Sequence, residues 1–195
     1  MAESPYGEIV NMPSENVKFE KSYIGWSRGK SFVSRAIQKL DQSYFNHVYR
    51  KFVSKCGLIL IYESHMSGGV QITPYQHLLS AKTKGIVEKV FEVEVPLDDA
   101  DTQLLWNDCI PLHGKSYDKH QILLYFTWIR IFKKSSNYRK RLDRKNHPDK
   151  YTCNEFVVES GKYGDPLVEG LDFSYTPELL FRHIEHKRSL DMFKL

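Results

Sequence analysis

The amino-acid sequence predicts a single α+β domain, with a small antiparallel sheet packed with helices. Strand-like segments joined by short turns fill the middle of the chain, and segments with helical spacing stand before and after them. Of the 195 residues, 41% are hydrophobic and 13% aromatic, which is typical of a folded protein with a sizeable core. Residues 1–20, rich in Pro, Ser and Glu, are expected to be irregular, and residues 21–195 to form the domain.

The first helix is predicted at residues 31–40. Its apolar side chains recur at helical spacing: Phe32, Val33, Ala36, Ile37 and Leu40. Ser31 is the expected N-cap, because a serine side chain accepts a hydrogen bond from the free N–H groups of a first helical turn.

A β-hairpin is predicted next, with strands at residues 45–53 and 58–63. The four residues between them suit a short loop in which Gly57 is left-handed. A hairpin centred on Lys55 sets His47 directly opposite Glu63, so that both side chains share one face of the sheet. The same register predicts two further pairs, Tyr49 with Ile61 and Lys51 with Ile59.

The rest of the chain continues the alternation of strands and helices. The predicted elements are a turn at Gly68-Gly69, a strand at Val70 and Ile72, a helix from Thr73-Pro74, a strand at 90–95, a helix from Asp118 to about 134, a polar basic stretch at 135–150, a helix from Cys153 to about Gly161, and a last helix from Thr176-Pro177. Thr73 is the expected cap of its helix, with Pro74 at the first helical position and Gln76 at the capping-box position.

The most informative residue is Cys153. Thr152 and Glu155 have the spacing of a capping box, which predicts that a helix begins at Cys153. Free N–H groups and the helix dipole favour negative charge at that end. Thiols at helix N-termini ionise more readily than free ones, and the thiolate is the reactive form. Cys153 is therefore a candidate nucleophile.

His47 is the candidate base for Cys153, and Glu63 is the candidate residue that orients the imidazole. The alternatives are structural: an isolated cysteine in an apolar helix is commonly a small core residue, and an isolated histidine commonly a satisfied structural one. Cys56 and Cys109 are interpreted as structural, because neither stands at a helix start or strand end.

The order of short motifs resembles that of the permuted papain-like enzymes, the circularly permuted branch of the NlpC-type superfamily that includes YaeF/YiiX-like amidases. The resemblance covers about residues 26–161. The matching motifs are the helix at 31–40, Asn46-His47-Val48, Ile61-Tyr62-Glu63, Gly69-Val70-Gln71-Ile72-Thr73-Pro74, Gly114-Lys115-Ser116-Tyr117-Asp118 and Tyr151-Thr152-Cys153-Asn154-Glu155-Phe156-Val157. Each is weak alone, but their order and spacing are fairly specific.

The resemblance implies a circularly permuted papain-like fold with the nucleophile at a helix N-terminus, and a catalytic Cys153, His47 and Glu63. It implies a cysteine hydrolase that cleaves an amide bond without metal or cofactor, and peptidoglycan is the favoured substrate. An acyltransferase or thioesterase on lipid-like substrates would use the same residues. Asn46 and Asn154 stand where the family commonly has serine, and the insertion at 133–150 puts the substrate in question more than the chemistry.

Other classes are less well supported by the sequence. The histidines and cysteines lack the Cys-x-x-Cys or His-Glu-x-x-His spacing of zinc sites. The basic segment 130–150 is diluted by Asp143 and Asp149, so nucleic-acid binding is not favoured, although a non-catalytic protein with an anionic partner is the alternative class.

No apolar run is long enough to span a bilayer, and the start of the sequence lacks the features of a signal peptide. The expectation is a soluble protein made in the cytoplasm, with export by another route left open. The absence of a regular cysteine pattern fits a protein without disulfides.

Overall fold

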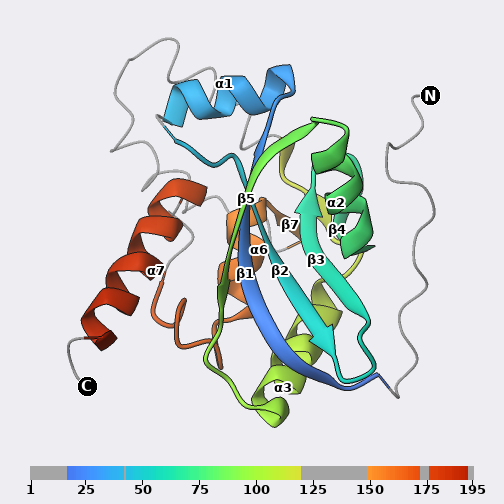
Figure 1. Ribbon diagram of the computed structural model, residues 1–195, viewed down its shortest axis with the longest axis vertical. Helices are drawn as coiled ribbons and strands as arrows, with labels where there is room; N and C mark the ends of the chain where they lie inside the picture. Colours follow the sequence, from blue (N-terminus) through green and yellow to red (C-terminus); the bar gives the residue numbers. More distant parts are fainter. Residues whose placement is uncertain (1–16, 42, 120–148, 172–175, 193–195) are drawn as a thin grey trace.

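The computed structural model describes residues 17–41, 43–119, 149–171 and 176–192, and shows an α+β fold (Figure 1). In this part of the chain, a five-stranded antiparallel sheet has the order β4-β3-β2-β1-β5, and a short parallel pair joins β6 to β7. The strands are β1 (Phe19–Gly29), β2 (His47–Ser54), β3 (Ile59–His65), β4 (Gly69–Pro74), β5 (Val87–Glu94), β6 (Ser116–Tyr117) and β7 (Lys150–Tyr151). The predicted α+β class and antiparallel sheet are confirmed.

Helices surround the sheet. They are α1 (Phe32–Asp41), α2 (Tyr75–Thr83), α3 (Asp99–Cys109) with a following 3-10 turn (Ile110–Leu112), α6 (Cys153–Ser160) and α7 (Pro177–Met192). Helix α6 packs on β2 and β3, α3 packs on β1, and α2 contacts β5, β3 and β4. Figure 1 shows α1 at the upper end of the sheet and α3 at the lower end. No described helix is both long and apolar enough to cross a bilayer.

Most of the predicted helix starts are confirmed, and one needs correction. Helices α1, α6 and α7 begin at or next to the predicted residues. Helix α2, however, is preceded by Pro74 as its N-cap, without a side-chain hydrogen bond, so Thr73 is not its cap. Thr73 instead belongs to the end of β4. The helix predicted from Asp118 to about 134 lies almost wholly outside the described residues.

Strand β1 was not predicted, although it is the longest strand and pairs with both β2 and β5. Its centre lacks an apolar–polar alternation, because Gly25 and Ser27 lie among buried residues on either side of Trp26. At Gly25 the backbone meets the ring of Tyr49 so closely that an added Cβ would lie 2.2 Å from the Tyr49 Cζ atom. Tertiary packing therefore makes this segment a strand, and the periodicity of its sequence does not predict it.

The predicted register of the β2–β3 hairpin is wrong by two residues. Lys51 pairs with Ile61, not with Ile59, and Arg50 pairs with Tyr62. Tyr49 is correspondingly not opposite Ile61. The Gly57 prediction is confirmed, with a φ of 82° in the loop. Because side chains alternate along a strand with a period of two, a slip of two residues keeps every side chain on its predicted face.

Candidate active site

Cys153 lies at the first position of α6, as predicted. The capping box is present, and the Glu155 carboxylate accepts a 2.7 Å hydrogen bond from the Thr152 backbone N–H. The Cys153 side chain is buried, with the residue only 5% exposed. Cys153 thus lies at the end of α6 where backbone N–H groups have no partners within the helix.

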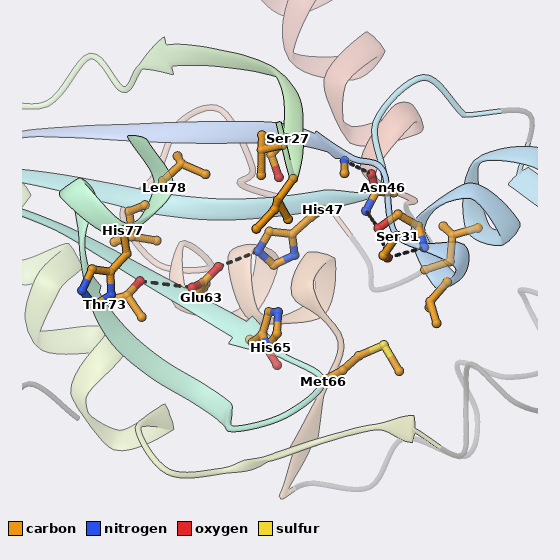
Figure 2. Close-up of a pocket in the computed structure, with 18 of the residues that line it drawn as sticks. Ser27, Ser31, Asn46, His47, Glu63, His65, Met66, Thr73, His77 and Leu78 are labelled. Carbon is orange, nitrogen blue, oxygen red and sulfur yellow. Dashed lines mark hydrogen bonds and ion pairs between the residues drawn. The ribbon is translucent and has the colours of Figure 1, made fainter. Parts of the chain in front are cut away.

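His47 is the first residue of β2 and forms an ion-pair contact with Glu63. The distance from His47 Nε2 to Glu63 Oε2 is 2.7 Å (Figure 2). The observed register makes this a diagonal contact between neighbouring strands, and not the directly opposed pair that was predicted. The other oxygen of Glu63 accepts a 3.1 Å hydrogen bond from Thr73 Oγ1. Thr73, predicted as a helix cap, thus positions the Glu63 carboxylate, which in turn positions His47.

His47 and Glu63 each favour the charged form of the other. Burial lowers the pKa of His47, but hydrogen bonds to Cys153 and Glu63 and the negative charges of both outweigh it and raise the pKa to about 10. Burial raises the pKa of Glu63, but the hydrogen bond and charge of His47 outweigh it, so the net shift is downward. At neutral pH the imidazole is therefore protonated and faces the Glu63 carboxylate.

The start of α6 is tied to the strand that carries Glu63. Ser64 Oγ donates a 2.7 Å hydrogen bond to the Tyr151 carbonyl, two residues before Cys153. On the same face of β3, the ring of Tyr62 stacks on that of Phe156 with centroids 5.4 Å apart. These contacts position the thiol relative to the histidine and carboxylate.

Two side chains near the site were not singled out by the sequence. Tyr117 lies close enough for the charges of Cys153 and Glu155 to act on it; burial, and then these charges, raise its pKa well above 10. The ring of His65 lies 6.2 Å from that of His47, and burial lowers its pKa. In the sequence, Tyr117 stood out only as part of the Gly-x-x-Tyr-Asp motif. No sequence pattern pointed to His65 as a site residue.

A cavity of about 350 Å³ lies beside His47 and Glu63. In Figure 2 it extends from Ser31 and Asn46 on one side of the histidine to His77 and Leu78 on the other. His47, Glu63 and Tyr117 line the cavity, and Cys153 is not among its lining residues. A pocket of this size can hold part of a small substrate.

The remaining cysteines lie elsewhere. Cys56 is exposed in the β2–β3 loop, where hydrogen bonding from Ser54 lowers its pKa. Cys109 is fully buried at the end of α3, and burial raises its pKa to about 12. Among the residues with described positions, no three His, Cys, Asp or Glu side chains gather as a metal site would require. Most of the basic segment 130–150 lies outside the described residues.

Comparison with known proteins finds similarity to solved structures and no assignment by sequence. No protein family matches the chain, and no curated protein matches it. The fold is similar to that of the metalloprotein YiiX from Escherichia coli O157:H7, a DUF1105 protein, with a TM-score of 0.51 and 19% identity over 75% of this chain and 67% of that one. At this identity the similarity shows a related fold and carries no statement about activity.

Proposed function

We propose that this chain is a cysteine hydrolase of circularly permuted papain-like fold that cleaves an amide bond. One observation carries the proposal: His47 contacts the Glu63 carboxylate at 2.7 Å and lies near enough to Cys153, at a helix N-terminus, for that side chain to raise the His47 pKa. That is the arrangement of nucleophile, base and orienting group that covalent catalysis requires. The fold similarity to YiiX, which the motif order suggested independently, supports the same reading.

The geometry supports a two-step acyl transfer. The Cys153 thiolate attacks the amide carbonyl carbon, and the developing oxyanion is stabilised by the Cys153 backbone N–H. The carbon–nitrogen bond then breaks, and the leaving amine takes the proton of the His47 imidazolium. In the second step, neutral His47 takes a proton from water, whose oxygen attacks the thioester. The carbon–sulfur bond breaks, releasing a carboxylic acid and restoring the thiolate–imidazolium pair.

Glu63 acts on His47 and not on the substrate. Its carboxylate accepts from Nε2, which leaves the other ring nitrogen for Cys153 and stabilises the protonated ring. A peptidoglycan peptide as substrate stays a prediction from the resemblance alone.

The decisive test is the pH dependence of Cys153 alkylation by iodoacetamide, followed by mass spectrometry. A Cys56→Ser background removes the exposed thiol, whose pKa is also lowered. We expect rapid labelling that persists well below the free-thiol pKa of about 8.5 and is lost in His47→Ala. The matched control is His65→Ala, the neighbouring histidine, which should label like the parent. Labelling that ignores His47 and follows an ordinary thiol would refute the proposal.

A further inference from the structure

Helix α1 has an inner side that faces the protein and an outer side that faces solvent. Ser34 and Ile37 line the cavity beside the catalytic candidates, so they mark the inner side. Phe32, Arg35 and Lys39 stand at positions i, i+3 and i+7 of the helix, and all three are exposed. The outer side therefore presents a phenylalanine that is 88% exposed together with two positive charges.

The turn between α2 and β5 extends this outer side. The Lys30 N–H donates a 3.0 Å hydrogen bond to the Ile86 carbonyl, which holds the turn beside the start of α1. Ile86 is 49% exposed. Three exposed lysines belong to the same stretch: Lys82, Lys84 and Lys89. Its one acidic residue, Glu88, is paired with Arg28 at 3.3 Å. The turn and the outer side of α1 together form the basic face, at the upper end of the molecule in Figure 1.

Helix α3 has an outer side with the same spacing and the opposite charge. Asp101, Leu104 and Asp108 stand at positions i, i+3 and i+7, and all three are exposed, Leu104 by 60%. The other side of the helix belongs to the core, where Leu105 and Trp106 are buried. The exposed stripe is the acidic face. In Figure 1, α3 lies at the lower end of the molecule, far from α1 at the upper end.

The charges of the two stripes are available to a partner. On the acidic side, Asp99 pairs with Lys55 at 2.5 Å. Asp101 and Asp108 form no ion pair within the described part of the chain, and neither do the two cations on the outer side of α1. Residues 96–114 contain no Lys or Arg, so α3 supplies no counter-charge of its own. Opposite charges on two surfaces favour and orient their encounter.

We propose that the acidic face binds the basic face of a second copy of this chain, with α3 of one copy packed against α1 of the next. Leu104 then lies against Phe32 and Ile86 of the neighbour, and the two aspartates approach the cations of α1. Charge complementarity and equal spacing identify the occupant, since both helices are about 15 Å long and repeat their exposed side chains at the same interval.

The contact is head-to-tail, because the two faces lie at opposite ends of the molecule. Every added copy leaves one basic and one acidic face uncovered, so assembly continues unless a ring closes. A contact between two short helices is small, and small interfaces are weak. We therefore expect association that depends on protein concentration. This inference is independent of the proposed cysteine hydrolase.

Sedimentation velocity of the full chain tests the assembly, with a reductant to prevent disulfides through the exposed Cys56. We expect the weight-average sedimentation coefficient to rise between about 10 and 500 µM protein, as for a weak contact. The rise should be smaller in about 1 M salt, where charges are screened beyond about 3 Å. A coefficient that stays at the monomer value would overturn the proposal, even if the basic face bound anionic vesicles or duplex DNA.

Two variants distinguish a head-to-tail contact from a symmetric one. Phe32→Ser/Arg35→Ser disrupts the basic face, and Leu104→Ser/Asp108→Ser disrupts the acidic face. We expect each variant alone to stay monomeric. An equal mixture should form a heterodimer and nothing larger, because each variant keeps one intact face. Association of either variant alone, or a mixture that stays monomeric, would overturn the head-to-tail contact.

The matched control is Lys162→Ser/Tyr163→Ser, which removes an exposed cation and an aromatic side chain that is 82% exposed, in the turn after α6. This variant should assemble like the parent. Loss of assembly in the control would assign the association to general surface stickiness and overturn the proposed faces. Circular dichroism identifies any loss that arises from unfolding, and substitutions at exposed positions are expected to leave the fold intact.

Discussion

Arg50 forms a 2.6 Å ion pair with Asp165, and both side chains are completely buried. Arg50 lies three residues after His47 on β2. Its guanidinium also donates to Ser160 Oγ at 2.6 Å and to the Val157 carbonyl at 2.7 Å, both in α6. One side chain thus joins the strand that carries the candidate base to the helix that carries the candidate nucleophile.

Removing Arg50 alone should be strongly destabilising. We expect Arg50→Met to lower the free energy of unfolding by about 3–5 kcal/mol, because it leaves the Asp165 charge buried without a partner. The double variant Arg50→Met/Asp165→Leu should recover much of that loss, since it removes both charges. Urea unfolding measures all three proteins. A double variant as unstable as the single one would show that packing of the guanidinium, and not the orphaned charge, dominates.

Gly161 should tolerate no side chain, because the Arg50 guanidinium occupies the space next to it. An added Cβ would lie 2.2 Å from Arg50 Nη2 and 2.5 Å from Val168 Cγ2. We expect Gly161→Ala to cost about 1–3 kcal/mol of unfolding free energy, as overpacked sites do. Gly164→Ala is the control, since no atom lies within 4 Å of its added Cβ. Thermal and urea unfolding of the two variants should differ clearly; similar stabilities would contradict the close approach.

The charge of His47 should depend on both neighbours. Its pKa is raised to about 10 by Cys153 and Glu63 against the opposing effect of burial. Following the His47 C2–H signal by NMR, we expect the titration midpoint to lie far above the ordinary value of about 6.5 and to fall in Cys153→Ser and in Glu63→Gln. A midpoint that does not move in either variant would separate His47 from the other two residues.

The same shift makes the stability contribution of the His47–Glu63 pair depend on pH. The folded state holds the imidazole proton more tightly than the unfolded chain, so the stabilisation is fully present below about pH 6.5 and is lost as the pH rises through about 10. Glu63 is already ionised across this window, because its pKa is lowered. We expect Glu63→Gln to destabilise the protein more at pH 6 than at pH 10.5 in urea unfolding. Equal effects at both pH values would argue against a charged pair.

We predict that Tyr117, whose pKa is influenced by the charge of Cys153, donates its hydroxyl to the oxyanion formed in the reaction. The hydroxyl stays protonated, since burial and the charges of Cys153 and Glu155 raise its pKa well above 10. We expect Tyr117→Phe to lower kcat for a p-nitrophenyl acyl ester by about 100-fold, the typical effect of losing one oxyanion donor. Alkylation of Cys153 forms no oxyanion and should be unchanged. Tyr151→Phe, on the paired strand β7, is the matched control; an equal loss there would assign the effect to packing.

Sequence alone was sufficient where the decisive interactions are local. The capping box of Thr152 and Glu155 spans three residues, so its spacing predicted the helix start at Cys153, which the structure has. The alternation of side chains along β2 and β3 put His47 and Glu63 on one face, and this held although the register was wrong by two. The helices that begin near Ser31 and Thr176 followed from caps and apolar spacing in the same way.

Tertiary structure decided what depends on contacts between distant residues. Strand β1 is defined by its pairing with β2 and β5 on either side, because its own sequence has no strand periodicity. Three features join residues whose separation along the chain follows no pattern: the hydrogen bond from Thr73 to Glu63, the buried pair of Arg50 and Asp165, and the cavity beside His47. Local hydrogen bonding and periodicity are written in consecutive residues, whereas register, long-range ion pairs and cavities arise only when the packed elements meet.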